Sequence, residues 1–346
     1  MTKGNAFVLG ATGQIGRAAV RALVADGWEV TAGSRRGVRD EKWPDEVRTV
    51  RVDRGEEGAL AAALGAGTDV LVDVVAFDAA HGRQLTGLAD RIGSAVVISS
   101  GAVYEDEQGR NFDTQDEPDG FPRYPVPIPE TWRTVAPGDS SYGTRKVALE
   151  RELLGAGGKL PTTVLRAAAV HGPYSPGPRE LWFVKRALDG RPVRILAEGG
   201  RSVFHPAHVD NLAELIRLAA SKPGTRVLNG ADPEAPTVAE IGAAIDAAMG
   251  VTSETIPFDG PPGKDWVGCT PWTAPHSVVL DMAAAERELG YRPVVATYAE
   301  SLPGTIEFLA ATVAEQDWRE AFPGLVKYGI DFFDYAAEDA WLAARR

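Results

Sequence analysis

The stretch Phe7-Val-Leu-Gly-Ala-Thr-Gly-Gln-Ile-Gly16 decides how the rest of the chain is interpreted. The apolar run Ala6 to Leu9 predicts a strand, and the apolar spacing that follows predicts a helix. Gly10, Gly13 and Gly16 let the chain turn sharply and let backbone N–H groups approach an anion beside the helix N-terminus. This pattern is typical of a dinucleotide-phosphate site, although an ordinary tight turn would also explain it. The residues downstream must decide.

The composition indicates an ordinary globular protein of 346 residues, with 44% hydrophobic and 24% charged residues. The length predicts one large α/β domain with a smaller one. The formal net charge of −12 argues against nucleic acid or an anionic membrane as the main partner, while a local basic pocket for a phosphate stays open.

Cys269 is the single cysteine, so the chain has no internal disulfide framework, which fits a reducing compartment. We expect a buried or incidental thiol there rather than a catalytic one. The sequence shows no signal peptide and no run long enough to cross a bilayer, so a cytoplasmic protein without a membrane partner is expected.

Strands alternate with helices through residue 100, which predicts a doubly wound parallel sheet. Ligands of such sheets lie beyond the carboxyl ends of the strands. The expected strands after the first cover 28–34, 47–52, 69–75 and 94–99, and the expected helices include 56–64 and 82–92.

The end of the second expected strand carries Ser34, Arg35 and Arg36, where an acid for the ribose 2′-hydroxyl would indicate NAD. An arginine fork there can bind a 2′-phosphate, so we favour NADP over NAD, although paired arginines are also common on solvated loops. Asp53, after the third strand, could contact the adenine or simply cap the next helix.

A long irregular segment, 105–140, is first acidic and then proline-rich. Its aromatic residues, Phe112, Phe121, Tyr124 and Trp132, favour an ordered flap over the cleft. The later chain predicts strands at 162–166, 193–196, 202–204 and 226–229, and helices at 180–188, 209–220, 237–249, 281–289 and 298–313. An aromatic-rich segment, 318–341, closes it.

Ser100, Tyr142 and Lys146 form the strongest candidate site. Ser100 ends the expected strand at 94–99, and Tyr142 and Lys146 are four residues apart on one helix face. A nearby ammonium is expected to lower the tyrosine pKa, so that the phenol can exchange a proton with a substrate oxygen held by the serine. Each residue taken singly would more often be structural.

The chain resembles the extended short-chain dehydrogenase/reductases of the NAD(P)-dependent epimerase/dehydratase type over residues 5 to about 310. The matching motifs occur in the family's order: Gly10-Ala-Thr-Gly-Gln-Ile-Gly16, Val97-Ile-Ser-Ser-Gly-Ala-Val-Tyr104, Tyr142-Gly-Thr-Arg-Lys146, Leu165-Arg-Ala-Ala-Ala-Val-His-Gly-Pro173, His208-Val-Asp-Asn-Leu-Ala213 and 281–291.

This resemblance implies a Rossmann-type domain at 1–169 plus about 201–229, and a smaller C-terminal α/β substrate domain at about 170–200 and 230–346. It also implies a small-molecule substrate and a homodimer. Ser100, Tyr142 and Lys146 would be catalytic. Cofactor contacts are expected from Gly10, Thr12, Gly13, Gln14, Ile15, Gly16, Ser34, Arg35, Arg36, Asp53, Val75, Ala76, Ser99, Tyr142 and Lys146. Substrate contacts are expected from Ala102, His171 and Arg201.

The departures from the family bear on the substrate. Nucleotide-sugar members usually carry an arginine where this chain has Phe204, and Arg201 is the nearest arginine. Lys264 is the only basic residue between 251 and 281, where another arginine is common. The gap from Ser100 to Tyr142 is also longer than usual, which suggests a specialised lid. The first two differences weaken a nucleotide-sugar reading.

Histidines offer a weak alternative signal. His205, His208 and Asp210 lie close in sequence, but no third histidine or cysteine is near, so no metal site is expected. Three functions therefore stand: an NADP-dependent oxidoreductase acting on a carbonyl or secondary alcohol as the leading hypothesis, a nucleotide-sugar epimerase or dehydratase with bound NAD(P), and a non-catalytic NAD(P)-binding protein.

Overall fold

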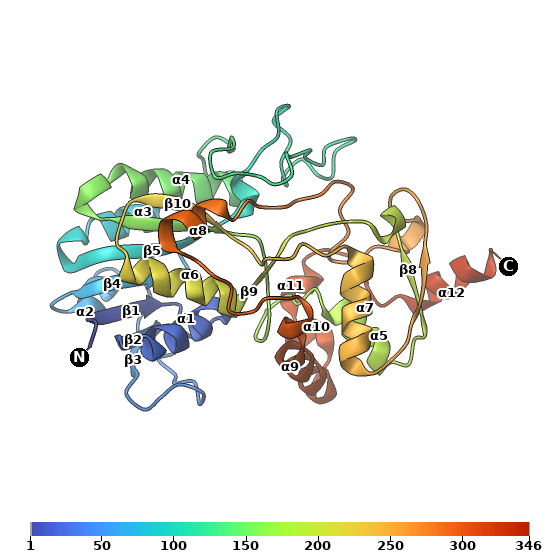
Figure 1. Ribbon diagram of the computed structural model, residues 1–346, viewed down its shortest axis with the longest axis horizontal. Coiled ribbons are helices and arrows are strands. Elements are labelled where there is room, and N and C mark those ends of the chain that lie inside the picture. The colour runs from blue at the N-terminus through green and yellow to red at the C-terminus, as the bar shows by residue number, and fades with distance from the viewer. Residues whose placement is uncertain (1, 346) are drawn as a thin grey trace. The chain divides into compact units, whose positions relative to one another are not determined.

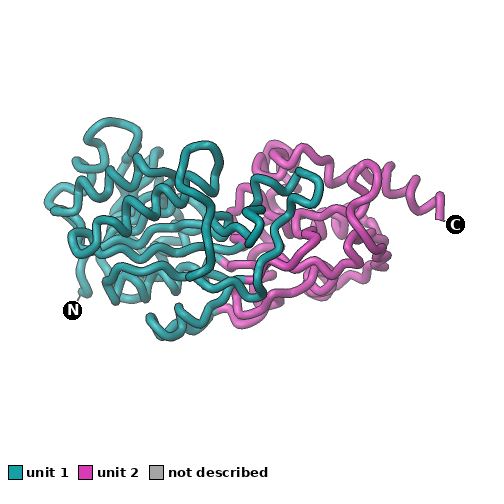
Figure 2. Tube along the Cα trace, turned by 90° about the horizontal axis from the view of Figure 1, so that it is seen from above, with its two compact units in different colours: residues 1–168, 209–231, 280–294 teal, residues 169–208, 232–279, 295–346 magenta. Residues whose placement is uncertain are grey.

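The computed structural model describes residues 2–345, which fall into two compact units (Figure 2). Unit 1 comprises Met1–Ala168, Val209–Ala231 and Leu280–Val294, and unit 2 comprises Ala169–His208, Asp232–Val279 and Val295–Arg346. The sequence prediction put 201–208 in the first domain and 280–294 in the second. In the structure, 201–208 belongs to unit 2 and 280–294 belongs to unit 1.

Unit 1 is built on a seven-stranded, all-parallel sheet (Figure 1). Its strands, in the spatial order β10-β6-β5-β4-β1-β2-β3, are Arg226–Gly230, Thr162–Ala167, Ile92–Ser100, Thr68–Asp73, Asn5–Leu9, Glu29–Ser34 and Arg48–Arg51. The central strands are almost wholly buried, which explains their near-continuous apolar sequences. The predicted Rossmann-type sheet is confirmed.

Helices cover both faces of this sheet (Figure 1). On one face α1 (Gln14–Ala25) packs against α6 (Val209–Ser221). The other carries α2 (Ala59–Leu64), α3 (Ala79–Thr86) and α4 (Tyr142–Gly155), which bury leucines against the sheet. A further helix, α8 (Ala283–Leu289), packs on α6 and β10. The helix predicted at 56–64 is shorter in the structure, where it begins at Ala59. The helix predicted at 82–92 is shifted toward the N-terminus and covers Ala79–Thr86.

The segment 105–141 has no helix or strand in the described chain, yet side chains anchor it within unit 1. The Tyr124 hydroxyl donates to the Tyr104 carbonyl at 2.9 Å, and the Trp132 indole N–H donates to the Glu105 carbonyl at 2.9 Å. Phe112 packs edge-to-face on Tyr124 and on Phe121. The predicted aromatic residues thus order this segment locally. That it covers a bound substrate stays a prediction.

Unit 2 holds two small parallel ladders and a helical core. Strand β7 (Ala169–His171) pairs with β9 (Pro206–His208), and β8 (Val193–Leu196) pairs with β11 (Glu254–Pro257). The larger helices are α5 (Leu181–Leu188), α7 (Val238–Met249) and α9 (Leu302–Glu315). Short 3₁₀ helices in the two units are Ala89–Arg91, Gly101–Val103, Gly157–Lys159, Glu198–Gly200, Lys264–Trp266 and Ala299–Ser301.

Two sequence predictions for unit 2 were wrong. The strand expected at 202–204 is absent, because that segment makes only isolated bridges, from Val203 to Thr237 and from Phe204 to Val278. The ladder begins at Pro206 instead. Strand β11 is not among the strands expected from the sequence, since its four residues carry no alternating pattern and end in proline.

The aromatic C-terminal segment forms α10 (Trp318–Ala321), α11 (Pro323–Val326) and α12 (Tyr335–Ala343). Trp318, Phe322 and Phe332 are buried in the same cluster as Trp182 of α5. The segment therefore completes the core of unit 2. Within residues 2–345, no helix has the length and apolar character needed to cross a membrane.

Candidate active site

The glycine turn joins β1 to α1 and needs its glycines. Gly10 has a φ of +87°, and the Gly13 N–H donates to its carbonyl at 3.0 Å. A Cβ atom on Gly16 would lie only 2.3 Å from the Gly10 carbonyl oxygen. Side chains at these positions would force the strand and helix apart. The sequence interpretation of this turn rests on real steric contacts.

The N-terminus of α1 is left without a side-chain cap, because Gly13 stands at the N-cap. Backbone N–H groups of the first turn therefore point outward from a twelve-residue helix. The helix dipole adds partial positive charge at the same place. Small residues and backbone N–H groups at this helix N-terminus fit a dinucleotide pyrophosphate, and the half-buried Thr12, Gln14 and Ile15 are part of the same turn.

The exits of β2 and β3 hold the residues expected near the adenosine. Ser34 is buried, and its hydroxyl accepts the Gly37 N–H at 3.0 Å, while Arg35 and Arg36 are exposed. Asp53 accepts the Gly55 N–H at 3.0 Å and so closes its own turn. One carboxylate oxygen of Asp53 is therefore engaged locally, and its contact with an adenine stays a prediction.

The loop after β4 is positioned by a buried ion pair that the sequence interpretation missed. Asp73 is fully buried, accepts the Val75 N–H at 2.9 Å and pairs with Arg54 at 2.6 Å. This loop crosses above the glycine turn, because a Cβ on Gly10 would meet the Val75 side chain at 2.6 Å. The signal available in the sequence was an aspartate at the end of an otherwise apolar strand.

Ser100 and Tyr142 meet at the carboxyl edge of the sheet. Ser100 ends β5, and its hydroxyl accepts the Ala102 N–H at 3.1 Å. Tyr142 opens α4 directly after Ser141, the N-cap, which forms a capping box with Thr144. Burial raises the pKa of Tyr142 above its ordinary value, and a side-chain hydrogen bond with Ser100 opposes that rise. Tyr142 as a whole residue is 39% exposed, so part of its side chain reaches the surface.

Lys146 lies one turn further along α4, with its ammonium facing backbone carbonyls. Its Nζ donates to the carbonyl of Ala76 at 2.6 Å and to that of Ile98 at 2.9 Å. Nζ is also 5.6 Å from the centre of the Tyr142 ring and 5.2 Å from that of Phe77. Lys146 therefore ties the loop after β4 to β5 beneath the tyrosine.

The electrostatics differ from the sequence expectation. Burial lowers the pKa of Lys146 to about 8, although the carboxylates of Asp73 and Glu150 oppose the change. The ammonium faces carbonyls rather than the phenol oxygen, so in the protein alone the pKa of Tyr142 is raised and not lowered. Further positive charge near the hydroxyl is needed to favour the phenolate.

The model of the NAD-dependent epimerase/dehydratase family matches residues 6–229, nearly two thirds of the chain. The chain belongs to this family. The predicted resemblance is confirmed, and family membership makes the protein an NAD-dependent enzyme of the epimerase/dehydratase type.

Solved structures agree with this assignment at the level of fold. MoeE5 in complex with UDP-glucose and NAD is 20% identical, with a TM-score of 0.65 over 90% of this chain and 100% of that one. UDP-N-acetylglucosamine 4-epimerase from Methanobrevibacter ruminantium M1, in complex with UDP-N-acetylmuramic acid, is 18% identical with a TM-score of 0.68 over 90% and 100%. A putative epimerase from Burkholderia cenocepacia J2315 is 19% identical, with a TM-score of 0.69 over 90% and 99%. Curated proteins gave no match.

In this epimerase/dehydratase-family chain, Ser99 points away from the predicted cofactor. Its hydroxyl donates to Glu150 at 2.5 Å, and Glu150 also forms a two-point ion pair with Arg166, at 2.7 and 3.1 Å. Arg166 donates further to the Glu130 carbonyl at 3.1 Å. The network ties α4 and β6 to the 105–141 segment. Only the backbone of Ser99 is left for the contact that the sequence predicted.

The substrate residues predicted in unit 2 have other partners. His171 is 1% exposed and lies between Asp232, at 2.8 Å, and Glu180, at 3.4 Å. Direct contact with a substrate would require that cluster to open. The Arg201 side chain is 70% exposed and pairs with Asp259 at 2.7 Å. Sequence reasoning missed Glu180 and Asp232, which carry no motif around them.

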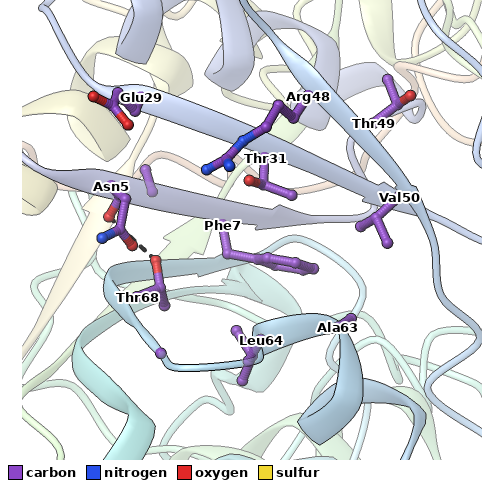
Figure 3. A pocket seen from close by; sticks show the side chains of 12 residues that line it. Asn5, Phe7, Glu29, Thr31, Arg48, Thr49, Val50, Ala63, Leu64 and Thr68 are labelled. Atoms are coloured by element: carbon purple, nitrogen blue, oxygen red, sulfur yellow. Dashed lines mark hydrogen bonds between the residues drawn. The ribbon is translucent and has the colours of Figure 1, made fainter.

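A pocket of about 400 Å³ in unit 1 lies elsewhere (Figure 3). Its lining includes Phe7 and the first residues of three strands, Asn5, Arg48 and Thr68. Because the glycine turn and Ser100 are at the carboxyl ends, this pocket is not part of the candidate active site. Among residues 2–345, no group of three or more His, Cys, Asp or Glu side chains is arranged to hold a metal ion.

Proposed function

We propose that this chain is an NAD-dependent epimerase or dehydratase that acts on a secondary hydroxyl of a nucleotide sugar. The observation that carries the proposal is the assembly of Ser100, Tyr142 and Lys146 at the carboxyl edge of the sheet that also bears the glycine turn. The nucleotide-sugar ligands printed for MoeE5 and for the Methanobrevibacter enzyme support the substrate class.

The residues would divide the work as follows. Tyr142 takes the proton from the substrate hydroxyl through its phenol oxygen, and Ser100 donates a hydrogen bond to the same oxygen. Lys146 holds the loop carrying Ala76 and supplies positive charge beneath the tyrosine ring. The chemistry that bound NAD supplies is acceptance of hydride at the oxidised carbon and its later return, with positive charge that favours the phenolate.

The test is the variant Tyr142→Phe, with Tyr328→Phe as control because Tyr328 is an exposed tyrosine of unit 2. Turnover of a panel of UDP-sugars, followed by product chromatography, should fall at least about 100-fold in Tyr142→Phe. NAD content of the purified protein should stay unchanged. Undiminished turnover in that variant would refute the mechanism.

A second candidate is an NADP-consuming oxidoreductase that reduces a ketone or oxidises a secondary alcohol. It is favoured by Arg35 and Arg36, whose exposed side chains form no ion pair within residues 2–345. The double variant Arg35→Gln/Arg36→Gln should then weaken NADP binding and leave NAD binding unchanged. This candidate requires added NADP for turnover, whereas the epimerase or dehydratase needs none.

The remaining expectations stay predictions. Light scattering after size-exclusion chromatography tests the homodimer, and cell fractionation tests the cytoplasmic location. Stoichiometric NAD(P) binding without turnover of any sugar nucleotide or carbonyl compound would favour the non-catalytic alternative.

A further inference from the structure

Arg179 of unit 2 is held by aromatic rings rather than by a carboxylate. It lies in the loop between β7 and α5, and its guanidinium carbon is 5.5 Å from the centre of the Phe204 ring and 5.3 Å from that of Trp272. Trp272 is fully buried, so one wall of this arrangement is rigid. Both distances lie within the range of a cation–π interaction. The rings fix the guanidinium without using its hydrogen-bond donors.

The donors of Arg179 are unsatisfied within the described chain. A guanidinium carries five N–H donors, and no acceptor within residues 2–345 takes any of them. The Nε atom is buried without a partner. The two terminal nitrogens are not buried, so their N–H groups are accessible to an acceptor that another molecule supplies.

Other arginines of unit 2 show what a satisfied site looks like. Arg186 also stacks on a tryptophan and also has a buried Nε without a partner, but its terminal nitrogen pairs with Glu338. Arg319 stacks on Trp318 at 4.7 Å and pairs with Asp331 at 2.9 Å. In these two arginines the stacked guanidinium also has a carboxylate partner, which Arg179 lacks within residues 2–345.

Two acidic residues of unit 2, Glu180, which follows Arg179 in the sequence, and Asp232, are already engaged by His171. Glu180 contacts His171 at 3.4 Å and accepts from the Tyr298 hydroxyl at 3.3 Å. Asp232 contacts the other nitrogen of His171. Burial would raise the pKa of Glu180, but hydrogen bonding and charge from His171 outweigh it and lower the pKa, and the charge of Arg179 adds a smaller contribution without an ion pair. Glu180 therefore attracts the Arg179 guanidinium electrostatically but accepts no hydrogen bond from its N–H groups.

We propose that Arg179 binds an anionic oxygen group, a phosphate or a carboxylate, of the substrate. The planar fork of arginine matches two oxygens of either group, and an aromatic backing leaves both terminal nitrogens available. The assignment of this anion to the substrate rests on the proposed function. The binding of the anion itself does not.

Calorimetric titration of the NAD-loaded protein tests the proposal with three probes: UDP, inorganic pyrophosphate and succinate. Wild type should bind at least one of them, and the identity of the probe distinguishes a nucleotide phosphate, a free phosphate and a carboxylate source. Arg179→Gln should weaken that binding about 10- to 100-fold, and Arg179→Lys should weaken it less. Thermal melting shows that each variant is folded.

The matched control is Arg319→Gln, which removes a tryptophan-stacked guanidinium whose carboxylate partner is present; its affinity for the probe should equal that of wild type. Wild type that binds none of the three probes, or a folded Arg179→Gln that binds as tightly as wild type, would overturn the proposal. If Arg179→Gln loses binding while Tyr142→Phe keeps turnover, the proposed function fails and Arg179 stands. If Tyr142→Phe loses turnover while a folded Arg179→Gln binds the probe as tightly as wild type, only the proposal for Arg179 fails.

Discussion

Replacing His171 by glutamine should remove the main alkaline pH dependence of unit 2. His171 is buried between the carboxylates of Asp232 and Glu180, stacks on Tyr298 at 5.3 Å and packs edge-to-face on His208. Burial alone would lower its pKa, but hydrogen bonding and charge from the two carboxylates outweigh it and raise the pKa to about 9. The folded protein therefore holds an imidazolium at neutral pH.

The size of the effect follows from that pKa. The ordinary histidine pKa is 6.5, and one pKa unit corresponds to about 1.4 kcal/mol, so protonation of His171 contributes about 3 kcal/mol to stability. Between those two values the folded state binds more protons than the unfolded state. The contribution is therefore complete below pH 6.5 and is lost as the pH rises through about 9. Of the two contacts, the 2.8 Å contact with Asp232 is the stronger, because the 3.4 Å contact with Glu180 is too long for a well-formed hydrogen bond.

Urea unfolding followed by tryptophan fluorescence measures this at pH 6, 7.5 and 9.5. At pH 6, His171→Gln should be less stable than wild type by about 3 to 5 kcal/mol. From pH 6 to pH 9.5 the unfolding free energy of wild type should fall by about 3 kcal/mol more than that of His171→Gln. His276→Gln serves as the control, because His276 lies in the same unit outside this cluster. Parallel pH profiles for wild type and His171→Gln would refute the charged cluster.

Two further predictions concern unit 1. Gly16→Ala places a Cβ against a backbone carbonyl of the turn and should weaken NAD binding at least about 100-fold in a fluorescence titration, whereas Gly155→Ala, on α4 in open space, should bind normally. Glu150→Ala leaves a buried guanidinium unpaired and should cost about 3 to 5 kcal/mol in urea unfolding, while Glu152→Ala, which breaks an exposed ion pair on the same helix, should cost under about 1 kcal/mol. Equal effects within either pair would contradict the packing described.

The candidate site residues of unit 1 could be located from the sequence because each follows directly from a strand or helix boundary. The glycine turn comes after β1, Ser100 ends β5 and Tyr142 opens α4. In a parallel sheet the carboxyl ends of the strands share one edge, so local patterns suffice to bring such residues together. The spacing of Tyr142 and Lys146 similarly needs only the helix period.

The missed residues act through partners that are distant in sequence. Asp73 is recognisable only with Arg54 beside it, and Glu180 only with His171 and Asp232, which follow on separate segments. The predicted lowering of the tyrosine pKa by lysine was wrong for the protein alone for a related reason. Sequence spacing placed the two side chains on one face, but the direction of the ammonium depends on carbonyls contributed by the loop after β4 and by β5.

Arg179 connects the chain's overall charge to its substrate. A net charge of −12 disfavours an extended anionic partner, because such a partner meets the averaged field of the surface. A single phosphate or carboxylate meets a different environment, since charges farther than about 8 Å are screened at physiological ionic strength. No acceptor within residues 2–345 takes a hydrogen bond from the Arg179 side chain, while the carboxylates of Glu180 and Asp232 are engaged by His171. An acidic protein can therefore bind a small anion at one point of its surface while it repels polyanions. It does so by short-range hydrogen bonds, and mutation of Arg179 should remove that discrimination without changing the chain's long-range repulsion of polyanions.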